Sequence, residues 1–359
     1  MTYSDPLPFS ADLENIEPEK EAETILDLDD KFDEILETTY ENSCHAIRSV
    51  HAKSHGIAKG SLTIEEGLKP ELAQGVFAQS GRHDAYIRMS TNAGDILHDN
   101  IHLPRGFALK ICDLKGERLP DADGNTQDFI FLNAPAFPAP DAQTFAKNLG
   151  LLAKTTDKVE WLKKIAADTF KLGNDARQKA GLDPSPALAS MGGVPHSEPL
   201  ALDYFSATPF RYGQYVAKFM LRPAAEWMKE LAGKTVEIGD DRDGLRHHVR
   251  EQFMRNDAEW DFCVQLLRDI DKQPVEDSSV IWPEDVSPFE KVATLAIPRQ
   301  DSWDEQLVRK VNETLHFSPW TGIMDHLPMG NINRARQDTY RHSVRFRAEK
   351  NGCPIHEPS

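Results

Sequence analysis

Cysteine is scarce in this 359-residue chain, which contains only four, none of them in a C-x-x-C pair. The scarcity argues against a disulfide framework and against the usual cysteine-based zinc site. Residues 1–20 are polar and acidic and lack the apolar core of a secretory signal. We therefore expect a cytoplasmic protein with reduced thiols.

Positive charge and long apolar runs are also lacking. The chain has 41 Lys and Arg against 58 Asp and Glu, a formal net charge of −17. Such a balance argues against a nucleic-acid partner, which needs a basic patch, and against docking on anionic lipid. No stretch has the roughly 20 apolar residues that span a bilayer. We expect a globular protein with no nucleic-acid or membrane partner.

The hydrophobic pattern alternates between helical and strand-like segments. Helical spacing recurs in residues 22–40, 141–182, 224–232 and 245–269 and in two C-terminal segments, one after Asp301 and one containing Tyr340. Short β-like runs occupy parts of 82–133, then 204–209, 212–221 and 291–297. A loop rich in Pro, Ser and Gly covers 183–199. The pattern predicts an α+β fold whose mostly antiparallel sheet closes into a barrel. Residues 1–40 would form an N-terminal arm and helix, and 41–359 a single domain.

Near the C-terminus, Arg336 and Tyr340 stand four residues apart, so they are neighbours on one face of a helix. A phenol with a pKa near 10 ligates a metal at neutral pH only if its anion is stabilised, and an adjacent guanidinium does this. Arg347 lies about three turns beyond Arg336 and would suit a carboxylate. Taken alone, an Arg–Tyr pair at this spacing is a common stacking contact on exposed helices.

Four further sequence motifs indicate that the Arg336–Tyr340 pair is functional. In order they read R-S-V-H-A-K (48–53), R-M-S-T (88–91), P-R-G-F-A-L-K (104–110) and D-F-I-F-L-N-A-P-A-F (128–137). The V-I-W-P-E segment (280–284) and R-x-x-x-Y (336–340) follow. Blocks of this kind in this order resemble the catalase family, over roughly residues 45–347.

The resemblance implies a catalase-like antiparallel β-barrel with surrounding helices, and a haem b whose iron is ligated by the phenolate of Tyr340. Tyrosine ligation of haem is a property of catalases. His51 would be the distal base, Ser90 the partner of its second ring nitrogen, and Asn133 the distal amide that orients the peroxide. Further residues expected to bind the haem are Arg48, Arg88, Phe137, Phe145, Arg336 and Arg347.

The chain departs from the family in several places. Only 19 residues follow Tyr340, Ser54-His55-Gly56 replaces the family's glycine start, and Met89 replaces an aromatic residue. The segment between Phe145 and Tyr204 is not recognisable as the family's, and it offers no place for a nucleotide site. Less protein around the haem implies a wider approach for organic molecules. This favours a short, catalase-like haem peroxidase, an oxidoreductase acting on a peroxide and a small organic reductant.

Four alternatives remain open: a small catalase, a fatty-acid hydroperoxide isomerase or dehydratase of the allene oxide synthase type, a haem-binding protein without turnover, and a zinc protein. Relatives of the isomerase tend to carry threonine before the distal histidine, where this chain has Val50. Zinc would require His45, His51 and His55 to converge, without an H-E-x-x-H motif or a cysteine partner. We also expect a homo-oligomer, a dimer or a tetramer.

Overall fold

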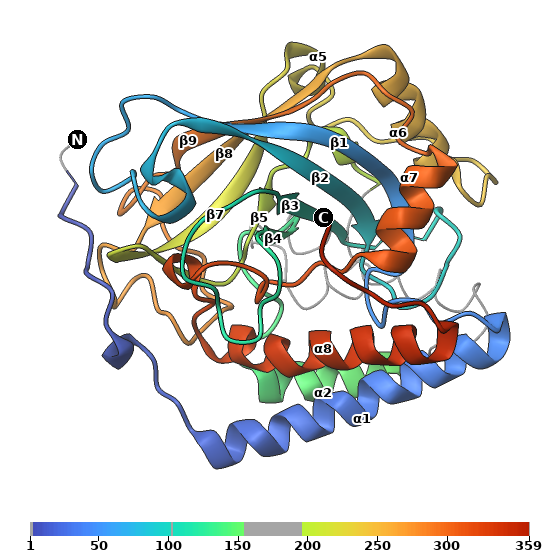
Figure 1. Cartoon of the computed structure of the whole chain (residues 1–359), viewed down its shortest axis with the longest axis horizontal. Coiled ribbons are helices and arrows are strands. Elements are labelled where there is room, and N and C mark those ends of the chain that lie inside the picture. Colours follow the sequence, from blue (N-terminus) through green and yellow to red (C-terminus); the bar gives the residue numbers. More distant parts are fainter. Residues whose placement is uncertain (1–2, 102, 154–195, 359) are drawn as a thin grey trace, which may run out of the picture.

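A closed antiparallel β-barrel forms the centre of the computed structural model, which describes residues 3–101, 103–153 and 196–358 (Figure 1). Its sheet has the order β5-β4-β3-β2-β1-β9-β8-β7-β6, and β5 also pairs with β7, so eight strands close the barrel. The short strand β6 pairs antiparallel with the first residues of β7. The strands are β1 (Ser54–Ile64), β2 (Gly81–Thr91), β3 (Arg105–Ile111), β4 (Gln127–Leu132), β5 (Tyr204–Phe205), β6 (Phe210–Tyr212), β7 (Tyr215–Pro223), β8 (Ala258–Leu266) and β9 (Glu290–Ile297). The predicted fold class is confirmed.

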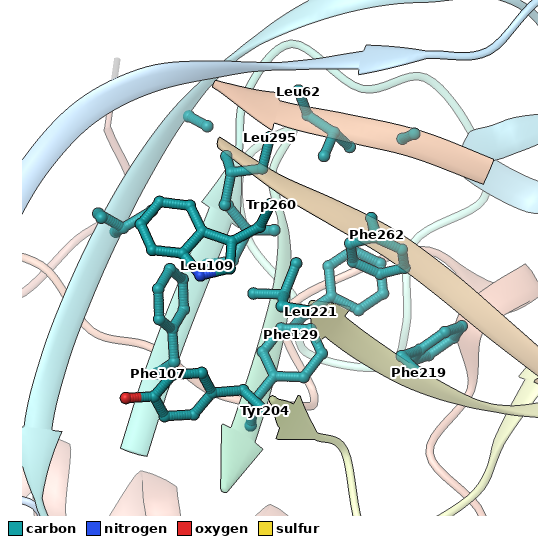
Figure 2. Close-up of a cluster of buried hydrophobic side chains, with 14 of the residues drawn as sticks. Leu62, Phe107, Leu109, Phe129, Tyr204, Phe219, Leu221, Trp260, Phe262 and Leu295 are labelled. Carbon is teal, nitrogen blue, oxygen red and sulfur yellow. The ribbon is translucent and has the colours of Figure 1, made fainter. Parts of the chain in front are cut away.

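Large apolar side chains fill the interior of the barrel (Figure 2). The Phe129 ring contacts Phe262 and Phe219 at centroid distances of 4.9 and 5.1 Å, and Phe107 contacts Trp260 at 5.4 Å. Because side chains alternate across a strand, the residues between these aromatics on β3 and β4 face outward. The barrel interior is therefore a packed core, and a ligand site has to lie on its outer flank.

Three helices cover one flank of the barrel: α1 (Pro18–Ser43), α2 (Ala142–Ala153) and α8 (Asn331–Asn351) (Figure 1). They share a hydrophobic cluster that includes Leu28 and Phe32 of α1, Ala146 of α2 and Ile332 of α8. The other α-helices of the described part are α5 (Glu226–Lys229), α6 (Gly244–Arg255) and α7 (Glu305–Arg309), which a π-helical turn (Lys310–Thr314) continues. Within the described residues, no helix has both the length and the apolar character needed to cross a bilayer.

The N-terminal arm wraps around the molecule before α1. The backbone N–H of Leu7 donates to the Leu267 carbonyl at 2.8 Å, and that of Phe9 donates to the Gln214 carbonyl at 2.7 Å. Arg334 of α8 then pairs with three carboxylates: Glu14 of the arm, Glu21 of α1 at 2.7 Å, and Glu276 at 3.0 Å. The arm and the first helix are thus tied to the last helix.

The predicted helix over 245–269 is wrong in its second half. Helix α6 ends at Arg255, and strand β8 begins at Ala258. Trp260, Phe262 and Val264 alternate into the core, so a period of two replaces the helical period after Asn256 and Asp257. The prediction also omitted β1, whose Ser, Gly and Ala residues give little hydrophobic signal. Of the helix expected over 141–182, α2 covers the described part, and most of the 183–199 loop lies outside the described residues.

Candidate active site

A deep cavity lies between the outer wall of the barrel and the three-helix layer. It consists of two adjoining compartments with about 720 and 860 Å³ of space outside the protein atoms, including the solvent at their openings. Both compartments are lined by His51 and Tyr340, and they share four further residues: Phe32, Val50, Ile130 and Thr339. The first compartment also takes in Arg48, Ser90, Arg88 and Arg347, and the second Arg336, Phe137 and Phe145. Nine of the ten predicted site residues therefore line one cavity.

Backbone contacts fix the position of His51. Its φ is +53°, in the left-handed region that few non-glycine residues adopt. Its N–H donates to the Asn92 carbonyl at 3.2 Å, and its carbonyl accepts from Arg88 Nη1 at 2.9 Å. The ring is held by Ser90, whose Oγ lies 3.1 Å from Nδ1. A Cβ at Gly106 would come within 2.5 Å of two ring atoms, so the ring occupies space that only glycine leaves free.

Burial decides the protonation state of His51. It lowers the pKa of the imidazole to about 3, and the positive charges of Arg88 and Arg336 contribute to the shift. The ring is therefore neutral near pH 7. If Nδ1–H donates to Ser90 Oγ, the lone pair lies on Nε2 and is free to accept a proton.

Three arginines, the buried Arg88 and Arg347 and the half-buried Arg48, converge on Asn312 in the π-helical turn. Arg48 and Arg347 donate to the Asn312 carbonyl at 3.2 and 3.0 Å, and Arg88 Nε donates to its Oδ1 at 3.1 Å. Arg48 also donates to the Val311 carbonyl at 3.1 Å. Single π-turns of this kind occur frequently at functional sites. Here the turn presents carbonyl oxygens that hold the guanidinium groups in place.

In the part of the chain that the structure describes, none of the three guanidinium groups forms a salt bridge within 4.0 Å, and the Glu313 carboxylate acts on Arg48 and Arg347 only from farther away. Arg347 Nε is buried without a hydrogen-bond partner among these residues. Burial lowers the pKa of all three, that of Arg88 to about 9 and that of Arg347 to about 10. Repulsion from neighbouring arginines adds to the shift of Arg48 and Arg88, and the negative charge of Glu313 opposes the shift of Arg48 and Arg347. Buried charge of one sign is costly, so this end of the cavity favours an anion.

Tyr340 lies on α8, at the boundary of the two compartments. Arg336 Nη2 donates to the Tyr340 hydroxyl at 3.1 Å, and its guanidinium carbon lies 5.3 Å from the centroid of the phenol ring. Arg336 is itself fixed, because Nη1 donates to Oδ1 of the buried Asn333 at 3.0 Å. Arg336 therefore holds a positive charge beside the Tyr340 oxygen.

The far end of the cavity is apolar. The rings of Phe137 and Phe145 meet edge to face at 5.1 Å, and Leu28 and Ile332 line the same compartment from α1 and α8. The cavity therefore has a cationic end and an apolar end, with His51 and Tyr340 between them. An apolar molecule with acidic groups at one end matches this distribution.

Asn133 is the one predicted site residue that does not line the cavity. Its Oδ1 accepts a hydrogen bond from the Arg105 backbone N–H at 2.8 Å.

Four residues of the site were not predicted from the sequence: Asn92, Gly106, Asn312 and His316. Asn92 and Gly106 belong to or adjoin the blocks quoted above and could have been considered. Asn312 and His316 lie in a stretch without any such signal.

The histidines of the alternative zinc site have separate partners. His45 pairs with Glu313 at 3.0 Å, His51 with Ser90, and His55 with Thr91. In the described residues, no three His, Cys, Asp or Glu side chains are grouped to hold a metal ion.

The fold and the cavity together define a β-barrel protein with a buried, cation-lined slot on its flank. A profile of the Catalase family matches residues 29–319. The chain belongs to the catalase family, a family of oxidoreductases.

Solved structures show the same fold. A fungal catalase superposes with a TM-score of 0.60 at 17% identity, covering 89% of this chain and 64% of its own length. Catalase A from Saccharomyces cerevisiae gives 0.57 at 16% identity, with 89% and 67% covered, and a bacterial catalase gives 0.56 at 17%, with 89% and 62%. The chain thus spans less than two thirds of the fungal catalase. No curated protein matches the sequence.

Proposed function

We propose that this protein is a haem-dependent peroxidase that reduces hydrogen peroxide or organic hydroperoxides and oxidises small organic molecules. The observation that carries the proposal is the cluster of Arg48, Arg88 and Arg347, which forms no salt bridge with the described residues and in which the buried Arg347 Nε has no hydrogen-bond partner among them. Such a cluster fits the two propionates of haem b. Phe137 and Phe145 fit the apolar edge of the macrocycle.

Tyr340 would provide the axial ligand. Its hydroxyl accepts from Arg336 at 3.1 Å, so the guanidinium favours the anionic oxygen that a ferric ion needs. Asn333 holds Arg336 by a second hydrogen bond, and this limits the loss of the contact by side-chain rotation.

Bound haem would supply the redox chemistry, passing two electrons from the reductant to each peroxide. The chain would manage the protons. His51 Nε2 takes the proton from one peroxide oxygen and returns it to the other, which leaves as water or as an alcohol. Ser90 keeps the ring oriented through Nδ1. With hydrogen peroxide, two reductant molecules each give one hydrogen atom, and two water molecules form.

The preference for peroxidase over catalase activity rests on the departures of the sequence from the family pattern, such as Ser54-His55-Gly56 and Met89. The protein is also proposed to act as a homo-oligomer, which sedimentation of the haem-loaded protein would test.

The proposal is tested by supplying hydrogen peroxide and a phenolic dye to the purified, haem-loaded protein, and by following dye oxidation and oxygen release in parallel. Dye oxidation with little oxygen supports the peroxidase. Vigorous oxygen release makes the protein a small catalase. If intact haem gives neither, the protein is a fatty-acid hydroperoxide isomerase or a haem protein without turnover, and the proposal fails. Failure to bind haem at all would also refute it.

A further inference from the structure

A second distal group, besides His51, has to come from a side chain that reaches the cavity. The sequence assigned this role to Asn133, but the Asn133 carboxamide oxygen is bound to the Arg105 N–H, and the residue does not line either compartment. Cleavage of a peroxide leaves partial negative charge on the departing oxygen, and a hydrogen-bond donor stabilises it there. The structure offers another carboxamide for this position.

Asn92 directly follows β2 and lines the apolar compartment together with His51. Its backbone is fixed on both sides, because its carbonyl accepts from the His51 N–H at 3.2 Å and its N–H donates to the Pro104 carbonyl at 3.0 Å. Its side chain is partly buried, and its carboxamide has no hydrogen-bond partner among the described residues. The residue that positions the His51 backbone thus carries an unused donor into the same cavity.

We infer that Asn92, and not Asn133, is the distal amide of this protein. This inference rests on the proposed function, since it assumes that a peroxide binds beside His51. While His51 transfers the proton from one peroxide oxygen to the other, Asn92 Nδ2 donates a hydrogen bond to the oxygen that leaves. Asn92 keeps its own protons throughout, and the step forms or breaks no bond at the amide.

Cyanide binding tests the assignment without turnover. Hydrogen cyanide bound to the ferric protein leaves its proton on the distal base, and the nitrogen of the bound anion accepts from any donor nearby. Asn92→Leu removes the carboxamide at nearly constant volume, and Asn92→Ala removes it without adding bulk. Both keep the backbone contacts. We expect each variant to bind cyanide about 3- to 10-fold more weakly in a Soret titration, which is the effect of one lost hydrogen bond.

Asn133→Asp is the competing variant, because it keeps the oxygen that Arg105 needs while it replaces the NH₂ donor by a second, negatively charged oxygen acceptor. Asn148→Leu, on the exposed face of α2, is the matched control. Weaker cyanide binding in Asn133→Asp together with unchanged binding in both Asn92 variants would overturn the inference, and so would unchanged binding in all of them. We also expect Asn92→Leu to lower the rate constant for peroxide by about 10- to 100-fold while haem content stays constant. A wild-type protein without haem would refute the proposed function instead, so the two failures are distinguishable.

Discussion

The two walls of the cavity are built in different ways. The His51 wall combines three separate segments: the loop before β1, the end of β2 with Ser90 and the following Asn92, and Gly106 of β3. Most of its contacts use backbone atoms. The Tyr340 wall is a single stretch of α8, in which Asn333, Arg336 and Tyr340 are neighbours at helical spacing. One wall depends on the tertiary fold and the other on local sequence, so substitutions should affect them differently.

In the Tyr340 wall, substitution of Tyr340 itself should abolish normal haem binding. We expect Tyr340→Phe to lose haem on gel filtration, or to keep it without the ferric phenolate absorption, because no oxygen remains to ligate the iron. Absorption and haem content are the measurements. Tyr215→Phe, on β7 and outside the cavity, is the control. Wild-type absorption in Tyr340→Phe would refute the assignment of the ligand.

In the His51 wall, substitution of His51 should leave haem bound but slow the reaction with peroxide. We expect His51→Ala to lower the rate constant for peroxide by about 10² or more, the scale of a lost acid–base group. Stopped-flow mixing of the ferric protein with peroxide gives this constant. His247→Ala, at an exposed position of α6, should leave it unchanged. If His51→Ala reacts at the normal rate, His51 has no part in the mechanism.

A smaller change tests whether the position of the ring matters. Gly106→Ala places a methyl group about 2.5 Å from two atoms of the His51 ring, which then has to move. We expect about a tenfold loss in the same rate constant, with haem retained, because misplacement of a catalytic group by a fraction of an ångström is costly. Gly81→Ala, whose Cβ would come no closer than 3.9 Å to the His83 ring, is the matched control. Equal rates in the two variants would show that the ring tolerates displacement.

The smallest effect concerns pH. Burial, with the charges of Arg88 and Arg336, lowers the pKa of His51 to about 3. The neutral base is thus present above this value and is lost only as the pH falls through it. We expect the rate constant for peroxide to change by less than about twofold between pH 5 and 8, since the reference pKa of 6.5 no longer applies. A sigmoidal loss centred near pH 6.5 would contradict the buried, neutral state.

The same contrast explains what the sequence could predict. The α8 wall follows from the spacing of Arg336 and Tyr340, and the ordered blocks identify His51 and Ser90. The shared contact of Arg48, Arg88 and Arg347 with Asn312 has no sequence signal, because two of the three arginines donate to its backbone carbonyl. Asn133 was placed by its block alone, and only the tertiary contact with Arg105 shows that its oxygen is already bound. Strand β1 was missed because its small residues owe their burial to neighbouring strands.

The pairing of the first helix with the last has a consequence for synthesis. Phe32 of α1 lines the cavity together with Tyr340 of α8, and roughly 300 residues separate them. At typical rates of chain elongation, α8 is synthesised on the order of 15 to 60 s after α1. During that time the apolar face of α1 is open to water or to a chaperone. The cavity is thus completed only after the barrel, so the proposed haem would be loaded in the last stage of maturation.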